Sequence, residues 1–248
     1  MLYAEHPHTH TPSGFITARS PLPYAQHIFG TREGTHANST ETVRALAERF
    51  GAIAHMHQVH GNRVAMVEHG GLVPETDAII TAAPELWLAV KTADCVPILI
   101  SSPRAVAAIH AGWRSTEQNI LPKTIGLLCT EFNQTPEDLH LALGPCLSQP
   151  HFEVEATFQH RFTVRQPERF FSPSAKPGHE ESHVMMDLAG ILRAQAHEAG
   201  MLDIHLHSLA RCTYAEAATF NSYRRFQQGK DAHYATQVSL IRRQPEGL

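Results

Sequence analysis

The sequence lacks the features that mark proteins of membranes, nucleic acids and the cell exterior. No apolar run reaches the roughly 18 residues that cross a bilayer, and the N-terminus is polar rather than signal-like. No dense basic cluster accompanies the net charge of -4, so we expect neither nucleic acid nor membrane as a partner. The four cysteines form no CxxC pair, which favours reduced thiols. These absences predict a cytoplasmic protein.

The composition is otherwise that of a globular protein, with an unusually high histidine content. Hydrophobic residues make up 42% of the chain, enough to form a sizeable core. A length of 248 residues lies within the range that one core serves. We therefore expect a flexible N-terminus, residues 1–12, followed by one catalytic domain, residues 13–248. The 19 histidines are candidate bases and metal ligands.

The hydrophobic pattern predicts helices mixed with short strands. The clearest helix lies within residues 38–51, where Asn38 and Glu41 form a capping box and Gly51 ends the helix. Other helices are predicted after Arg114, over residues 153–162 and over 187–200. Apolar runs predict strands that include a hairpin of residues 96–101 and 105–111, and strands over 204–214 and 237–243. The predicted fold class is α/β (α+β), a single layered domain with mixed β-sheets flanked by helices.

Three candidate metal ligands lie at the predicted strand ends. Cys95 stands in "TADCVPILI", His110 in "AAIHAGWR" and His60 in "QVHGNRV". Taken singly, the cysteine is typical of a buried residue that packs in the core. His60 alone is typical of an exposed residue, and His110 alone is typical of a turn. Taken together, two histidines and a cysteine leave one position of tetrahedral zinc open, as in catalytic sites. The long separations between the three residues give this hypothesis little specificity.

Five motifs occur in the order of a known family: "QVHGNRV", "TADCVPILI", "AAIHAGWR", "LGPC" and "FNSYRR". Over residues 29–241 the chain resembles the YfiH/laccase-domain family, also called the multicopper polyphenol oxidoreductase or purine nucleoside phosphorylase family. The resemblance implies a layered α/β fold and zinc bound by His60, Cys95 and His110. It also implies phosphorolysis of adenosine, inosine, guanosine or methylthioadenosine, and hydrolytic deamination of adenosine.

The resemblance extends to further site residues. Arg32 in "FGTREGTH" and the arginines of "SYRR" match family arginines, and guanidinium groups suit phosphate. Asp94, next to a ligand, is expected to shuttle a proton or to orient a ligand histidine. The expected catalytic residues are Asp94, Arg32 and Arg114, and the expected substrate-binding residues are Gln58, Trp113, Arg224 and Arg225. Purine nucleoside and phosphate are the expected ligands of a monomer or small homo-oligomer.

Departures from the family pattern leave the substrate open. The "TGR" that follows "SYRR" in the family is absent, Ser115 replaces a glycine after "HAGWR", and the stretch after "FGTREGTH" is short. One alternative makes Cys95 a nucleophile and His110 its base, in a hydrolase that edits peptidoglycan precursors. Another is a copper-dependent polyphenol oxidase (laccase), although only one ligand set can be assembled. A non-enzymatic binding protein is the third.

Overall fold

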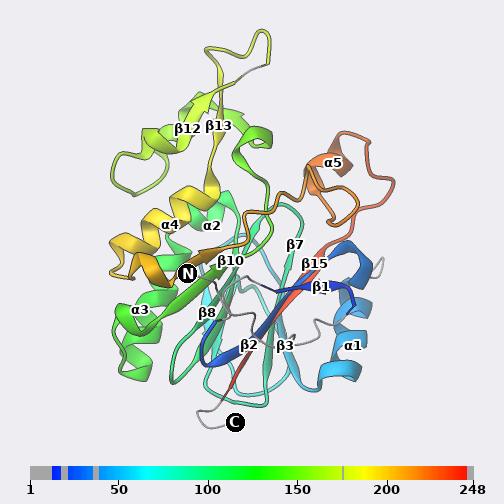
Figure 1. Cartoon of the computed structure of the whole chain (residues 1–248), viewed down its shortest axis with the longest axis vertical. Helices are drawn as coiled ribbons and strands as arrows, with labels where there is room; N and C mark the ends of the chain where they lie inside the picture. Colours follow the sequence, from blue (N-terminus) through cyan, green and yellow to red (C-terminus); the bar gives the residue numbers. More distant parts are fainter. Residues whose placement is uncertain (1–12, 18–21, 36–38, 175, 245–248) are drawn as a thin grey trace, which may run out of the picture.

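Two six-stranded sheets packed face to face form the centre of the molecule (Figure 1). The computed structural model describes residues 13–17, 22–35, 39–174 and 176–244. The first sheet has the order β1-β2-β15-β7-β3-β5. Its strands are β1 (Phe15–Ile16), β2 (Ala25–Gly30), β15 (Gln237–Arg243), β7 (Trp87–Thr92), β3 (Ile53–Met56) and β5 (Gly71–Val73). β3 is parallel to both of its neighbours, and the other pairs are antiparallel, so this sheet is mixed.

The second sheet is also mixed and has the order β14-β10-β8-β9-β6-β4. Its strands are β14 (Leu206–Ser208), β10 (His140–Leu143), β8 (Val96–Ser101), β9 (Val106–Ala111), β6 (Ala78–Thr81) and β4 (Val64–Met66). The outermost pair at each edge is parallel and the inner pairs are antiparallel. A small third sheet, of order β11-β13-β12, contains β11 (Glu153–Glu155), β13 (His183–Met186) and β12 (Phe171–Pro173).

Helices cover the outer faces of the two large sheets. The helices are α1 (Ser39–Phe50), α2 (Trp113–Glu117), α3 (Ile120–Phe132), α4 (Leu188–Glu198) and α5 (Tyr223–Gln227). Val43 and Leu46 of α1 pack on Ala89 and Leu240 of the first sheet. Helices α3 and α4 cover the outer face of the second sheet, on the opposite side of the molecule (Figure 1). The order of layers is thus helix, sheet, sheet, helix, which confirms the predicted fold class.

The alternation of side chains along the strands explains this layering. In β7, Leu88 and Val90 face the second sheet, whereas Trp87 and Ala89 face α1. Strands that are buried on both faces are apolar at nearly every position, and "VPILIS" and "VAAIHA" are examples. The core therefore consists of three clusters, one between the sheets and one under each helical layer.

Several predicted elements are confirmed, and others are shorter than expected. Helices occur within residues 38–51 and 187–200, and the predicted closing strand is β15. The helix predicted after Arg114 is instead two helices, because Asn119 between them has the left-handed φ of 59°. The helix predicted over 153–162 was wrong: β11 and a 3-10 helix, Ala156–His160, occupy it. Of the strand predicted over 204–214, only β14 forms.

The hairpin predicted from "VPILISSPRAVAAIHA" is present. β8 and β9 pair antiparallel, with Val96 opposite Ala111 and Pro97 opposite His110. Ser102 closes the turn, since its hydroxyl donates to the carbonyl of Ala105 and its backbone N–H does the same. This register brings the start of β8 and the end of β9 to the same end of the second sheet.

The flexible N-terminus predicted for residues 1–12, and the capping residue Asn38, lie outside the described residues. Within the described ranges, every helix is too short or too polar to cross a bilayer.

Packing between β2 and β15 gives the first prediction. A Cβ on Gly30 would lie 2.4 Å from the backbone oxygen of Val238, so Gly30→Ala should lower the free energy of unfolding by about 2–3 kcal/mol. Gly126 in α3 is the matched control, because a Cβ there meets no atom within 4 Å. Gly126→Ala should raise the free energy of unfolding by about 0.5–1 kcal/mol. Urea denaturation of both variants measures the difference, and equal effects would contradict this packing.

Candidate metal centre and substrate cavity

The three residues singled out as metal ligands lie together at one end of the sheets. The ligand atoms of His60, Cys95 and His110 are all within 4.8 Å of one another. Cys95 directly precedes β8 and His110 is the penultimate residue of β9, so the hairpin register brings them to the same edge. His60 comes from the loop between β3 and β4. Among the described residues this is the one group of three or more such side chains with metal-binding spacing.

A fully buried carboxylate, Asp77, ties two of these ligands together. Its Oδ1 lies 2.7 Å from Nδ1 of His110 and accepts the backbone N–H of His60 at 3.0 Å. Its Oδ2 accepts the backbone N–H groups of Gly61, at 2.8 Å, and of Val59, at 3.2 Å. Because Nδ1 of His110 is held by the carboxylate, Nε2 is the nitrogen left for the metal side. Asp77 is therefore a positioning residue that the sequence analysis missed.

The backbone around the ligands is shaped to fit them. His60 has the left-handed φ of 60°, which is uncommon for a residue other than glycine, and the Asp77 hydrogen bonds hold that turn. Gly112 follows the ligand strand β9. A Cβ at Gly112 would lie 3.0 Å from Sγ of Cys95 and 3.1 Å from Cδ2 of His60. Glycine is thus the residue that leaves room for both side chains.

The electrostatics of the centre favour a thiolate. Burial raises the pKa of the Cys95 thiol, but the charge of His110 and hydrogen bonds from His110 and His60 outweigh it and bring the pKa to about 6. Burial also lowers the pKa of His110, yet the Cys95 thiolate and Asp77 raise it to about 9. At neutral pH the protein without metal therefore holds a thiolate beside an imidazolium.

This donor set fits a divalent metal of the zinc type. Thiolate and imidazole are the ligands that such ions prefer, and the three ligand atoms lie within 4.8 Å of one another, near enough to share one ion. A buried carboxylate that fixes a ligand histidine, as Asp77 does, is the usual second interaction in such sites. Three protein ligands leave the fourth position to the adjoining cavity. The geometry supports metal binding without identifying the metal.

A cavity of about 990 Å³ adjoins the centre. Its walls contain the three ligands and five of the other predicted site residues, namely Gln58, Asp94, Trp113, Arg114 and Arg224. Tyr223 and Tyr234, both half exposed, form an edge-to-face pair with ring centroids 5.6 Å apart at the same cavity. The guanidinium of Arg114 lies over the Trp113 ring, 4.2 Å from its centroid. The cavity thus combines a metal centre, aromatic rings and cationic groups.

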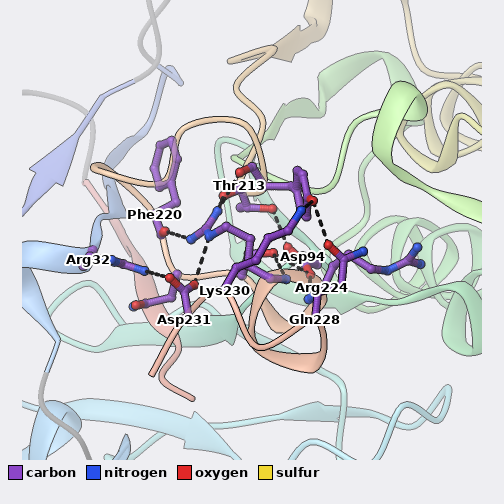
Figure 2. A network of polar contacts seen from close by, with 12 residues as sticks. Arg32, Asp94, Thr213, Phe220, Arg224, Gln228, Lys230 and Asp231 are labelled. Atoms are coloured by element: carbon purple, nitrogen blue, oxygen red, sulfur yellow. Dashed lines mark hydrogen bonds and ion pairs between the residues drawn. The ribbon is translucent and has the colours of Figure 1, made fainter. Parts of the chain in front are cut away.

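Asp94 holds the chain beside the cavity together. Its carboxylate accepts hydrogen bonds from the hydroxyl of Thr213, at 2.6 Å, from the hydroxyl of Ser222, at 3.0 Å, and from the backbone N–H of Arg224, at 2.6 Å (Figure 2). Neither oxygen is shown bonded to a ligand histidine, so the orienting role proposed for Asp94 belongs to Asp77. Asp94 instead anchors α5, which carries Arg224, to the start of β8.

Arg225 and Arg32 lie outside the cavity lining and bind protein groups. The buried Arg225 donates from Nε to Oδ2 of Asp231 at 2.9 Å, and its other nitrogens donate to the carbonyls of Thr213, Tyr214 and Phe220. Arg32 donates to Oδ1 of the same Asp231 at 2.9 Å (Figure 2). Arg225 is not available to a ligand, because its guanidinium donors close the loop before α5. Asp231 forms an ion pair with both guanidinium groups.

Gln58 also has a structural partner. Its Nε2 donates to the carbonyl of Lys91 at 2.7 Å, and its Oε1 accepts the N–H of Lys91 at 2.9 Å. The side chain therefore fixes the end of β7 rather than presenting a free amide. Sequence reasoning missed Lys91, Tyr223 and Tyr234 as cavity residues. The adjacency of Tyr223 to "RR" and of Lys91 to "TADC" was the available signal.

Removal of the Asp77 charge tests its positioning role. Asp77→Asn should lower the affinity for Zn²⁺ about 10–100-fold. The neutral amide lacks the negative charge with which the carboxylate accepts the hydrogen bond from His110 and holds its ring in place. Competition with a chromophoric chelator measures this affinity. Asp138→Asn is the control, since that exposed carboxylate caps a 3-10 turn away from the centre. Equal affinities in wild type and Asp77→Asn would refute the role.

The thiolate gives a prediction for protein stripped of metal. Alkylation of Cys95 by iodoacetamide should rise with pH through a midpoint near 6, because only the thiolate reacts. Burial raises the pKa of Cys146 to about 12, so Cys146 should stay unmodified at neutral pH and serve as the internal control. His110→Ala should move the Cys95 midpoint upward. Peptide mass spectrometry reads each site, and a Cys95 midpoint near 9 in wild type would contradict the ion pair.

Comparison with known proteins agrees with this geometry. A purine nucleoside phosphorylase of Rickettsia conorii is 32% identical over 220 residues, covering 85% of this chain and 88% of the relative. A purine nucleoside phosphorylase of Haemophilus influenzae is 31% identical over 226 residues, covering 86% and 89%. The structure of Bacillus licheniformis YfiH, 20% identical, superposes with a TM-score of 0.78 over 89% of this chain and 93% of that one. A Neisseria meningitidis protein, 26% identical, has a TM-score of 0.76 over 94% and 100%.

The family comparison covers almost the whole described chain. Residues 19–243 match the model of the family described as multi-copper polyphenol oxidoreductase laccase. This range contains both large sheets from β2 onward, the three metal-ligand candidates and every lining residue of the cavity. The chain therefore belongs to the family described as multi-copper polyphenol oxidoreductase laccase, with the YfiH-like fold.

Proposed function

We propose that this protein is a zinc-dependent purine nucleoside phosphorylase. The observation that carries the proposal is the position of the centre formed by His60, Cys95 and His110 in the wall of a cavity that also holds aromatic rings and guanidinium groups. The names of the relatives that are about 30% identical, purine nucleoside phosphorylases, support this choice of substrate.

The cavity residues suit a purine and a phosphate. Trp113, Tyr223 and Tyr234 offer ring faces and edges against which a purine base can stack. Arg114 and Arg224 supply cationic donors for phosphate oxygens. Arg114 is exposed above the Trp113 ring and forms no ion pair with a carboxylate of the described residues. In phosphorolysis, a phosphate oxygen forms a bond to C1′ of the ribose while the C1′–N9 bond breaks. The electron pair of that bond leaves with the base, and the proton that the phosphate loses passes to the base, giving ribose 1-phosphate and free purine.

The protein holds these reactants in a fixed frame. Bound zinc would supply a Lewis acid at the open side of the centre. Asp94 keeps α5 in place, which sets the position of Arg224 relative to the centre. Phe152 and Leu188 add apolar lining that excludes water from part of the cavity. Orientation of two reactants in one site accounts for much of the rate enhancement in such reactions.

A second function is favoured by one specific arrangement. Asp77, His110 and Cys95 form a hydrogen-bonded series of carboxylate, imidazole and thiolate, as found in cysteine hydrolases. A metal-free hydrolase acting through Cys95 is therefore the alternative. The copper oxidase has weaker support, since the described residues supply one ligand set where a multi-copper enzyme needs several.

Product analysis tests the main proposal. Zinc-loaded protein incubated with adenosine, inosine, guanosine or methylthioadenosine should release free base only when phosphate is present, as read by chromatography. Inosine formed from adenosine would additionally establish deamination. Cys95→Ser should lower kcat/KM for base release by about 100-fold or more, because it removes the thiolate ligand. Cys129→Ser, in α3, is the matched control.

The outcomes separate the candidates. Loss of base release on chelation, restored by zinc, supports the phosphorylase. Absence of base release from all four nucleosides in zinc-loaded protein would refute it. Hydrolysis that persists without metal and stops on alkylation of Cys95 would establish the cysteine hydrolase instead.

A further inference from the structure

One part of the cavity is not used by the proposed function. Its wall includes Ser39, His57, Lys91 and Thr236, in addition to the metal ligands and the residues around Arg114 and Arg224. Lys91 is half-buried near the end of β7. Its ammonium group is therefore partly removed from water, and this burial lowers its pKa. A cation in such a position calls for an anionic partner.

No such partner exists among the described residues. The hydrogen bonds of Lys91 to Gln58 use only its backbone, and no described side chain forms an ion pair with its ammonium group. Asp94 is the one carboxylate in the cavity lining, and its oxygens already accept from Thr213, Ser222 and Arg224. The cavity therefore has an uncompensated positive charge at Lys91.

The N-terminus of α1 adds to this positive character. Lys91 pairs with Val238 across β7 and β15, and Val238 faces α1, so Lys91 stands on the α1 side of the sheet. Helix α1 begins at Ser39, which lines the same cavity, and the N-terminus of a helix carries partial positive charge. Arg114 and Arg224 come from α2 and α5 instead, so the two groups of cations approach the cavity from different elements.

Thr236 supplies an unpaired hydroxyl near Lys91. Its Oγ1 is buried and has no hydrogen-bond partner among the described residues. Thr236 immediately precedes β15, whose first residue, Gln237, pairs with Thr92. The hydroxyl thus lies at the same sheet end as Lys91. Buried polar atoms nearly always have partners, so this unpaired hydroxyl is available to a group that accepts its hydrogen.

We propose that Lys91 and Thr236, at the N-terminus of α1, form a subsite for a phosphate group. An ammonium group, a hydroxyl and a helix N-terminus together match the charge and acceptor oxygens of phosphate. The phosphate is either inorganic phosphate or the phosphate of a nucleoside 5′-monophosphate. The link of this subsite to base release rests on the proposed function, whereas phosphate binding does not.

Calorimetric titration of the full chain with inorganic phosphate, and separately with adenosine 5′-monophosphate, tests the subsite. Lys91→Gln should raise the Kd for at least one of them about tenfold, as expected when a charged donor is lost. Lys91→Arg should stay within about threefold of wild type. Because Gln58 binds the backbone of residue 91, neither change should disturb β7. Lys176→Gln, an exposed lysine in the loop before β13, is the matched control of charge.

The two titrations distinguish the sources of the phosphate. Weaker binding of inorganic phosphate assigns the subsite to the free ion, and weaker binding of the nucleotide alone assigns it to a phosphorylated substrate. Unchanged Kd values for both in Lys91→Gln, or no binding of either by wild type, would overturn the proposal.

Thr236→Val provides a second test, in which phosphate binding should weaken without a loss of thermal stability. Loss of an unpaired hydroxyl should leave Tm unchanged or higher, while the Kd of the same phosphate ligand rises at least about threefold. Lower Tm with unchanged Kd would show that the hydroxyl serves the fold. Lys91-dependent binding without base release would refute the proposed function and keep the subsite. Base release with Kd values independent of Lys91 would support the proposed function and refute the subsite.

Discussion

The carboxylate of Asp77 is the constraint on which the candidate centre depends. Four groups compete for its two oxygens: the imidazole of His110 and three consecutive backbone N–H groups that start at Val59. One buried charge therefore fixes both a ligand ring and the strained turn that carries another ligand, His60. In the protein without metal, the His110 imidazolium lies between two negative charges, the Asp77 carboxylate and the Cys95 thiolate. The same carboxylate thus sets the positions of two ligands and raises the pKa of one of them, His110.

The fold serves the site by bringing strand ends to one edge. β7 ends and β15 begins there in the first sheet, while β8 begins and β9 ends there in the second. The loops at this edge supply ligands, cations and aromatic rings, and α5 and the small sheet lie at the same end of the molecule (Figure 1). Antiparallel neighbours make this possible, since each hairpin returns the chain to the edge from which it left.

Much of this could be predicted from sequence, and the failures have physical causes. Capping residues and apolar periods identified the helices that became α1 and α4, and turn residues identified the β8–β9 hairpin. Asp77 gave no signal, because a carboxylate before a strand is usually an exposed turn residue. Arg224 and Arg225 are adjacent in sequence but point about 100° apart on α5, so one lines the cavity while the other is buried. The helix prediction for residues 153–162 failed because their apolar pattern is too short to distinguish a helix from a strand.

The position of β15 has a consequence for the order in which the protein forms. This strand contains the last residues of the first sheet, yet it lies between β2 and β7. During synthesis the N-terminal parts of a chain emerge first. The strands of the second sheet, which carry Cys95 and His110, can pair before β15 is synthesised. In the first sheet, β2 and β7 have no strand between them until β15 is present. The cavity wall at Thr236 therefore forms only after the strands that carry Cys95 and His110 have been synthesised.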